Sequence, residues 1–278
     1  MPISPVLPSS GLTGWNFLKA SLPTQEKLFN SSADISRDVE YFKENIGNVK
    51  TLDDFMGDRR LRKVALGAFG LGEEIDKGAF VRKVLEEGTA DNRAFAVRLN
   101  NSDYLDMARM FDFSSGELSL SQSDVDSLVT DYQQESFEIS LGDVDNTMRL
   151  ALNFKREIAE LADKDLSESA GWFKAMGSVP LRTVLESAFN MPSGFSQLDI
   201  DKQKELLSDK ASSLFGGTSV DVFKDPEAIE TTVRRYLLQE QITSGPTANT
   251  PGFAALSLLT NSNPGASIVN LLASNSTG

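Results

Sequence analysis

The chain of 278 residues contains neither histidine nor cysteine. The lack of histidine removes the side chain that titrates near neutral pH and the commonest protein ligand of transition metals. The lack of cysteine excludes disulfides, thiolate nucleophiles and the usual structural zinc sites. A Ser–His catalytic triad is excluded as well. Any chemistry must use carboxylates, Lys, Arg, Tyr and hydroxyl groups, and no sequence arrangement of these predicts a catalytic residue, a metal site or a cofactor.

Long apolar runs and a signal-peptide pattern are also missing. No apolar stretch approaches the roughly 18 residues that cross a bilayer as a helix, so the sequence predicts no membrane insertion. The first residues, Met1 to Pro8, carry no positively charged side chain ahead of their apolar positions, which argues against a secretory signal. We expect synthesis in the cytoplasm, and export without a cleaved signal peptide stays open.

Positive charge is scarce, because 27 Lys and Arg stand against 40 Asp and Glu and give a net charge of −13. Phosphate backbones and anionic lipids repel such a chain, so the sequence predicts no nucleic-acid partner. The acidity is explained by solubility, with an acid-dependent role as the alternative.

The chain is rich in apolar residues at helical spacing. After Asp58, which can cap a helix, the apolar positions are Leu61, Val64 and Ala68, and Gly70 ends the pattern. No segment alternates with period two for long enough to form a strand. The sequence therefore predicts an all-α protein, a multi-helix orthogonal assembly. The other helices are expected at about residues 35–46, 80–88, 104–111, 121–132, 143–161, 172–176, 180–189, 206–215 and 225–237.

The two ends differ from this helical body, which is expected over residues 34–243. Residues 1–33 are rich in Pro, Ser and Thr and predict an extended segment, and residues 244–278 carry no charged side chain and predict a disordered tail. Both ends hold isolated large apolar residues. These either clamp the ends onto the body or bind a partner, as sparse anchors in polar segments often do. The candidate partner-binding residues are Trp15, Phe17, Leu18, Phe253, Leu256, Leu259, Leu271 and Leu272.

A dense basic cluster follows Asp58 in this otherwise acidic chain. Arg59, Arg60, Arg62 and Lys63 lie opposite the apolar face of the predicted helix. A solvated face with acidic neighbours explains them. The alternative is docking to an acidic surface, for which Arg59 and Arg60 are the candidate residues.

The chain contains an internal similarity. Residues 56–71 align without gaps to residues 176–191, with identities that include Met56/Met176, Leu61/Leu181 and Phe69/Phe189. Shorter collinear matches flank this pair. The hypothesis is a duplicated helical unit at about 35–113 and 145–243, and the alternative is that amphipathic helices resemble one another by chance.

Several stretches resemble an alphaproteobacterial family of unknown biochemical function whose genes often lie in flagellar gene clusters. The resemblance covers most of the first 240 residues and contains no catalytic motif. It implies a flagellar setting and protein partners that include flagellar components, but no site residue. The stretches that carry it are Gly14 to Leu18, Asp58 to Leu71, Tyr104 to Phe113, Phe137–Glu138 with Gly142–Asp143, and Met148 to Phe154.

We therefore expect a non-enzymatic structural or interaction protein, associated with flagellar assembly or structure. A cytoplasmic adaptor or export chaperone is the alternative. A third hypothesis is a carboxylate-based hydrolase, which a deep pocket with a close carboxylate pair of raised pKa would support.

Overall fold

The computed structural model describes residues 4–99, 101–114 and 116–244. Their regular secondary structure is entirely helical, which confirms the all-α prediction. The α-helices are α1 Gly11–Asn30, α2 Ala33–Asn45, α3 Leu52–Gly57, α4 Arg59–Ala68, α5 Gly78–Glu87, α6 Phe95–Arg98, α7 Ser102–Met110, α8 Gln122–Gly142, α9 Asn146–Asp163, α10 Glu168–Gly177, α11 Val179–Ala188, α12 Ile200–Phe215 and α13 Pro226–Ser244. Short 3₁₀ turns lie at η1 Ile46–Asn48, η2 Gly72–Glu74, η3 Phe195–Gln197 and η4 Val220–Lys224.

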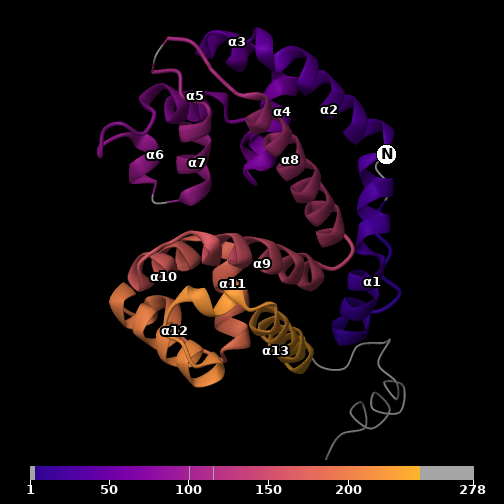
Figure 1. Cartoon of the computed structure of the whole chain (residues 1–278), viewed down its shortest axis with the longest axis vertical. Coiled ribbons are helices and arrows are strands. Elements are labelled where there is room, and N and C mark those ends of the chain that lie inside the picture. Colours follow the sequence, from indigo (N-terminus) through magenta and orange to yellow (C-terminus); the bar gives the residue numbers. More distant parts are fainter. Residues whose placement is uncertain (1–3, 100, 115, 245–278) are drawn as a thin grey trace, which may run out of the picture.

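The helices after α1 form two tiers, with α2–α8 above and α9–α13 below (Figure 1). Within the upper tier, α4 packs against α8 and α2. Within the lower tier, α11 packs against α13 and α9, and the contact between α8 and α9 joins the tiers. One continuous cluster of buried apolar side chains runs through both tiers, because each helix turns its apolar face inward.

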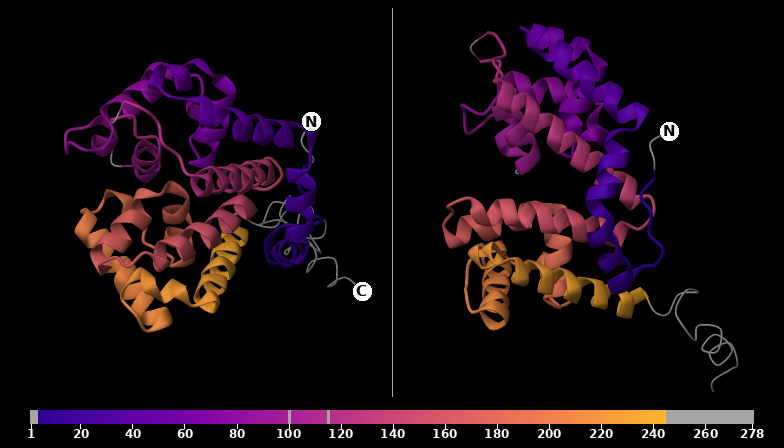
Figure 2. Two further views of the ribbon diagram at one scale, coloured as in Figure 1. Left: turned by 45° about the horizontal axis from the view of Figure 1, so that its top comes forward. Right: turned by 45° about the vertical axis from the view of Figure 1, so that its right-hand side comes forward.

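Residues 11–30 form helix α1, where the sequence predicted an extended chain over residues 1–33. Helix α1 contacts α2, α8, α9 and α13, so it runs along both tiers (Figure 2, right). Trp15 and Leu18 are fully buried in the core. Their burial stabilises a helix that the polar composition and the internal Pro23 would disfavour alone.

Polar contacts hold α1 against the last helix, α13. The indole Nε1 of Trp15 lies 3.2 Å from Glu230 Oε1 on α13, and Lys19 forms an ion pair with the same carboxylate. The prediction that Trp15 and Leu18 bind a partner is therefore wrong, because both side chains clamp the N-terminal helix onto the body.

The two similar segments form the same local structure, a helix followed directly by a second helix. We call this structure a helical corner, and it occurs as α3–α4 and as α10–α11. Helix α3 ends at Gly57 and α10 ends at Gly177, and in each case the next residue caps a ten-residue helix. The cap of α4 is Asp58, whose carboxylate accepts the Leu61 N–H at 3.1 Å. The cap of α11 is Ser178. The two segments thus enter their second helices in the same way.

The second helices of the two corners, α4 and α11, also end in the same way. The backbone turns into the left-handed region at Gly70, with φ of 68°, and at Asn190, with φ of 51°. The Leu71 N–H then donates to the Leu66 carbonyl at 2.8 Å, and the Met191 N–H to the Glu186 carbonyl at 2.9 Å. This is the helix-ending turn that a left-handed residue permits.

Packing extends the correspondence beyond the corners. Helix α4 packs on α8 as α11 packs on α13, and α2 and α9 take equivalent places beside them. The first predicted unit, residues 35–113, stops before α8 and therefore omits the helix that corresponds to α13. Duplication of the whole unit stays a prediction.

Candidate functional site

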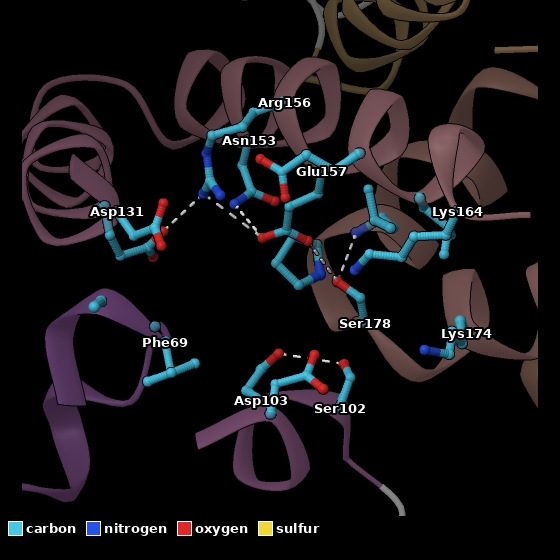
Figure 3. Close-up of a pocket in the computed structure, with 18 of the residues that line it drawn as sticks. Phe69, Ser102, Asp103, Asp131, Asn153, Arg156, Glu157, Lys164, Lys174 and Ser178 are labelled. Carbon is cyan, nitrogen blue, oxygen red and sulfur yellow. Dashed lines mark hydrogen bonds and ion pairs between the residues drawn. The ribbon is translucent and has the colours of Figure 1, made fainter. Parts of the chain in front are cut away.

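A polar cleft of about 400 Å³ opens between the two tiers. The end of α4 together with α7 and α8 forms one wall, and α9, the end of α10 and the start of α11 form the other. Figure 3 shows the lining side chains converging from both tiers. Its charged residues are Asp103, Asp106, Asp131, Glu135, Arg149, Arg156, Glu157, Glu160, Lys164 and Lys174.

Helix α9 contributes more of these residues than any other helix, and they lie in one stripe. Arg149, Asn153, Arg156, Glu157 and Glu160 follow one another at steps of four, three, one and three residues. Such steps place side chains on one side of a helix. The opposite side of α9 is buried in the lower-tier core, so packing of that apolar side turns the polar stripe into the cleft.

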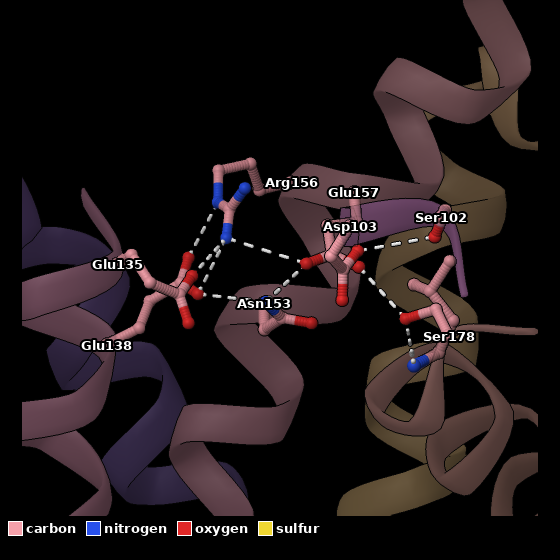
Figure 4. Close-up of polar contacts among 9 residues, drawn as sticks. Ser102, Asp103, Glu135, Glu138, Asn153, Arg156, Glu157 and Ser178 are labelled. Atoms are coloured by element: carbon pink, nitrogen blue, oxygen red, sulfur yellow. Dashed lines mark hydrogen bonds and ion pairs between the residues drawn. The ribbon is translucent and has the colours of Figure 1, made fainter. Parts of the chain in front are cut away.

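Arg156 is the centre of a buried ionic network (Figure 4). Its Nε lies 2.8 Å from Glu138 Oε1, and its Nη2 lies 2.9 Å from both Glu138 Oε2 and Glu135 Oε2. Glu138 is only 3% exposed. The two carboxylates come from adjacent turns of α8, so Arg156 ties α8 to α9 through charge-assisted hydrogen bonds.

Asn153 extends the network between two carboxylates. Its Nδ2 donates to Glu138 Oε2 at 3.0 Å and to Glu157 Oε1 at 2.8 Å. Asn153 is only 2% exposed, and its Oδ1 has no hydrogen-bond donor in the described structure. A buried carbonyl oxygen without a donor is costly, so this part of the network is less favourable than the part around Arg156.

The opposite wall presents Asp103 from the first turn of α7. Ser102 Oγ donates to Asp103 Oδ1 at 3.2 Å. Across the cleft, Ser178 Oγ donates to Glu157 Oε2 at 3.1 Å. Figure 3 shows Ser102 and Asp103 directed toward Glu157 and Ser178, so two carboxylates from different tiers face each other.

The environment of these carboxylates disfavours their ionised forms. Burial and the charge of Glu138 together raise the pKa of Glu135 to about 8, although Arg156 opposes the rise. Burial, together with the like charge of Glu157, raises the pKa of Asp103 to about 6. Burial also raises the pKa values of Asp131, Glu157 and Glu160. Desolvation and like charge thus concentrate at the cleft.

These carboxylates do not form a metal centre. Among the residues that the structure describes, no group of three or more acidic side chains is placed to hold a metal ion. Groups with raised pKa in a cleft can take up and release protons, and they can also accept hydrogen bonds from a cationic ligand.

The structure places the remaining predicted partner-binding residues that it describes outside the cleft. Arg59 Nη1 lies 2.5 Å from Asp76 Oδ1, and Arg60 stacks at 3.8 Å from the centroid of the Tyr41 ring. Both arginines and Phe17 are exposed, and the cleft includes none of the three. The five predicted anchors from Phe253 to Leu272 lie outside the described residues.

The sequence analysis missed the cleft. Its one sequence signal is the polar stripe of α9, in which Arg156 is flanked by Asn153 and Glu157. The partners of that Arg lie on α8, 18 and 21 residues away, so only the folded chain brings them together.

The fold and the cleft define an all-helical protein of two tiers with an acid-rich cleft between them. The chain belongs to the DUF1217 family of proteins of unknown function, whose family model matches residues 68–229. It is also similar to protein AGR_C_984 from Agrobacterium tumefaciens, known from an X-ray crystal structure. The two are 27% identical, with a TM-score of 0.67, over 88% of this chain and 100% of the Agrobacterium chain.

Among proteins with curated descriptions, none matches the chain. Within the described residues, no helix is both long and apolar enough to cross a membrane.

Proposed function

We propose that this protein acts by contact with a protein partner and catalyses no reaction, and that it serves flagellar assembly or forms a minor part of the flagellum. The flagellar setting is suggested by the sequence resemblance described above. The contact role is supported by the surface of the last helix.

Helix α13 carries an apolar surface on its final turns. Leu238 is 45% exposed and Ile242 is 73% exposed. They are four residues apart and therefore lie on one face of the helix. Val233, Tyr236 and Leu237 are buried instead, so the exposed pair is not needed for the core.

The position of this pair in the chain favours a docking role. The uncharged segment that begins at residue 244 and bears the predicted anchors Phe253, Leu256 and Leu259 follows it directly. An apolar helix face continuous with such a segment is a common way to bind a partner groove. Single exposed apolar residues are ordinary, so the proposal depends on this continuity.

Fractionation of cells that express the full chain tests the proposal. Mass spectrometry would compare purified hook–basal bodies with the cytosol. Recovery with the organelle supports a structural part, and recovery in the cytosol bound to a flagellar protein supports an adaptor or export chaperone. Recovery in neither form contradicts the proposal.

A matched pair of variants tests the docking surface. Ile242→Asp places a charge in the proposed contact, whereas Val179→Asp makes the same change at an equally exposed position, 73%, on α11. We expect Ile242→Asp to reduce recovery of the flagellar partner about tenfold and Val179→Asp to leave it unchanged. Equal recovery with both variants contradicts a role for α13.

A carboxylate-based hydrolase is the second candidate, because Asp103 and Glu135 have raised pKa values in a cleft. The close pair Glu135 and Glu138 does not fit this role well. Both residues lie on α8, and both are hydrogen-bonded to Arg156 on one wall. Hydrolysis with acid and base requires groups on two sides of the scissile bond. Turnover of a glycoside or ester substrate that Asp103→Asn abolishes would establish the hydrolase instead.

A further inference from the structure

A groove lies beside the first turns of α13, away from the cleft between the tiers. It has a volume of about 580 Å³ and opens between the end of α12, the turn η4 and the start of α13. Its lining includes the apolar side chains of Leu214, Phe215 and Val222. All three are only half-buried, so the groove leaves part of their apolar surface accessible.

One face of α13 leads from this groove to the exposed pair Leu238 and Ile242. Thr231, Arg235, Leu238 and Ile242 follow one another at steps of four, three and four residues. Such steps place side chains on one side of a helix. Thr231 itself lines the groove. The outer face of α13 therefore has an apolar depression at one end and an exposed apolar pair at the other.

Opposite charges accompany these two ends. Glu227 is exposed and lines the groove, whereas Arg235 is exposed one turn before Leu238. The Arg235 Nε donates to the Ala188 carbonyl at 2.8 Å. Within the part of the chain that the structure describes, neither Glu227 nor Arg235 forms an ion pair. Each side chain therefore keeps a charge that an external partner can match.

The spacing of these groups is self-complementary. Glu227 and Arg235 stand four residues before and after Thr231, about 6 Å away along the helix axis in each direction. A two-fold axis that passes near Thr231, perpendicular to α13, therefore places Glu227 of each copy beside Arg235 of the other. Leu238 lies about 10 Å beyond Thr231, which brings it and then Ile242 over the groove of the second copy.

We propose that two copies of the chain associate through antiparallel α13 helices about this axis, with Leu238 and Ile242 of each copy against the groove of the other and Arg235 paired with Glu227. The inference rests on the contact role proposed above for α13, and it names a second copy as the partner of this face. Burial of the apolar side chains stabilises the contact, and the two ion pairs set its register and direction.

Sedimentation velocity of the purified full chain over a series of concentrations tests the association. We expect a reversible dimer. Ile242→Asp should weaken it at least about tenfold, because the two-fold axis places a charge in both grooves. Val179→Asp, the equally exposed control on α11, should leave it unchanged. A chain that stays monomeric, or equal weakening by the two variants, overturns the proposal.

Charge reversal tests the direction of the helices. Glu227→Lys and Arg235→Glu should each weaken the dimer at least about tenfold, because each variant alone would form two like-charge pairs. Mixed in equal amounts, the two variants should associate again, since every pair between them has opposite charges. Circular dichroism checks that both keep the helical fold. A mixture as weak as its separate components overturns the antiparallel arrangement.

Failure of this inference and failure of the proposed function give different results. A chain that is monomeric when purified, yet still recovers a flagellar protein through α13, overturns the dimer alone. A dimer that responds to the variants as expected, but is recovered neither with the organelle nor with a flagellar protein, contradicts the proposed function alone.

Discussion

The two helical corners, α3–α4 and α10–α11, follow the same path with different surfaces. Several of their buried positions carry the same residues, with Leu61 matching Leu181 and Val64 matching Val184, and the others stay apolar where both are buried, as Ala65 and Leu185 do. Their exposed positions differ, since Arg59 corresponds to Val179 and Lys63 to Thr183. The comparison shows that the apolar face sets the path of the chain, whereas the outer face is free to change.

The capping residues of the two corners also differ in what they contact, and only one of them lines the cleft. Asp58 in the first corner also accepts the Tyr41 hydroxyl at 2.6 Å, within the upper tier. Ser178 in the second corner lines the cleft and donates to Glu157. The same structural position therefore serves packing in one corner and the polar cleft in the other.

The largest expected effect comes from the ionic network that lies between the corners. Arg156→Met leaves Glu138 buried without its cation and should lower the free energy of unfolding by about 3–5 kcal/mol. Urea denaturation followed by circular dichroism measures this loss. Arg59→Met, which breaks the exposed pair with Asp76 in the first corner, should cost far less, because exposed ion pairs contribute little to stability. Comparable losses would show that Arg156 is not the special group that the geometry indicates.

The aromatic residues that follow the two helices give the next comparison. Phe189 is fully buried, whereas Phe69 is half-buried and lines the cleft. Phe189→Ala should therefore cost about 3–5 kcal/mol, and Phe69→Ala clearly less. Chemical denaturation of both variants is the test, and the reverse order would refute the claim that the second corner is the better buried.

The left-handed residues at the ends of α4 and α11 are matched in conformation but not in type. Gly70→Ala introduces a Cβ at φ of 68° and should lower stability by about 1–2 kcal/mol. Asn190→Ala, at φ of 51°, should cost less, because Asn190 already has a Cβ in the left-handed conformation. Thermal unfolding of the two variants compares them, and equal losses would contradict this view.

The last effect concerns pH. Burial, the charges of Glu157 and Asp106, and the opposing effects of Ser102 and Arg156 set the pKa of Asp103 at about 6, above the ordinary 3.8. Between these two values the folded chain binds more protons than the unfolded chain, so this group lowers stability as pH rises, and the loss is complete above about pH 6.

Replacing Asp103 checks the sign of this effect. Asp103→Asn should be more stable than the parent chain at neutral pH, and the difference should vanish below about pH 3.8, where the Asp103 carboxyl is protonated in both the folded and the unfolded chain. Denaturation curves across this range measure the difference. A variant that is less stable at neutral pH would mean that the ionised carboxylate is stabilised in the cleft.

The sequence predicted the helices whose apolar spacing is regular, and it located the start of α4 at Asp58 and its end near Gly70. It missed α1, because that helix depends on the burial of Trp15 and Leu18 beside α13 at the far end of the chain. Local composition, with Pro23 inside the segment, gave the opposite indication.

The cleft escaped prediction for a related reason. Its residues come from several helices, and the polar stripe on α9 has the spacing of any solvated helix face. Only the packing of α8 on α9 distinguishes Arg156 from an exposed arginine.

The most direct test of the cleft between the tiers is a double-mutant cycle on the ion pair between Arg156 and Glu138, with Arg156→Met and Glu138→Gln measured singly and together by urea denaturation. If this pair joins α8 to α9, the double variant loses less stability than the sum of the two single losses, with a coupling free energy of about 1–3 kcal/mol. Single losses that simply add would contradict the account of the cleft as a buried ionic network.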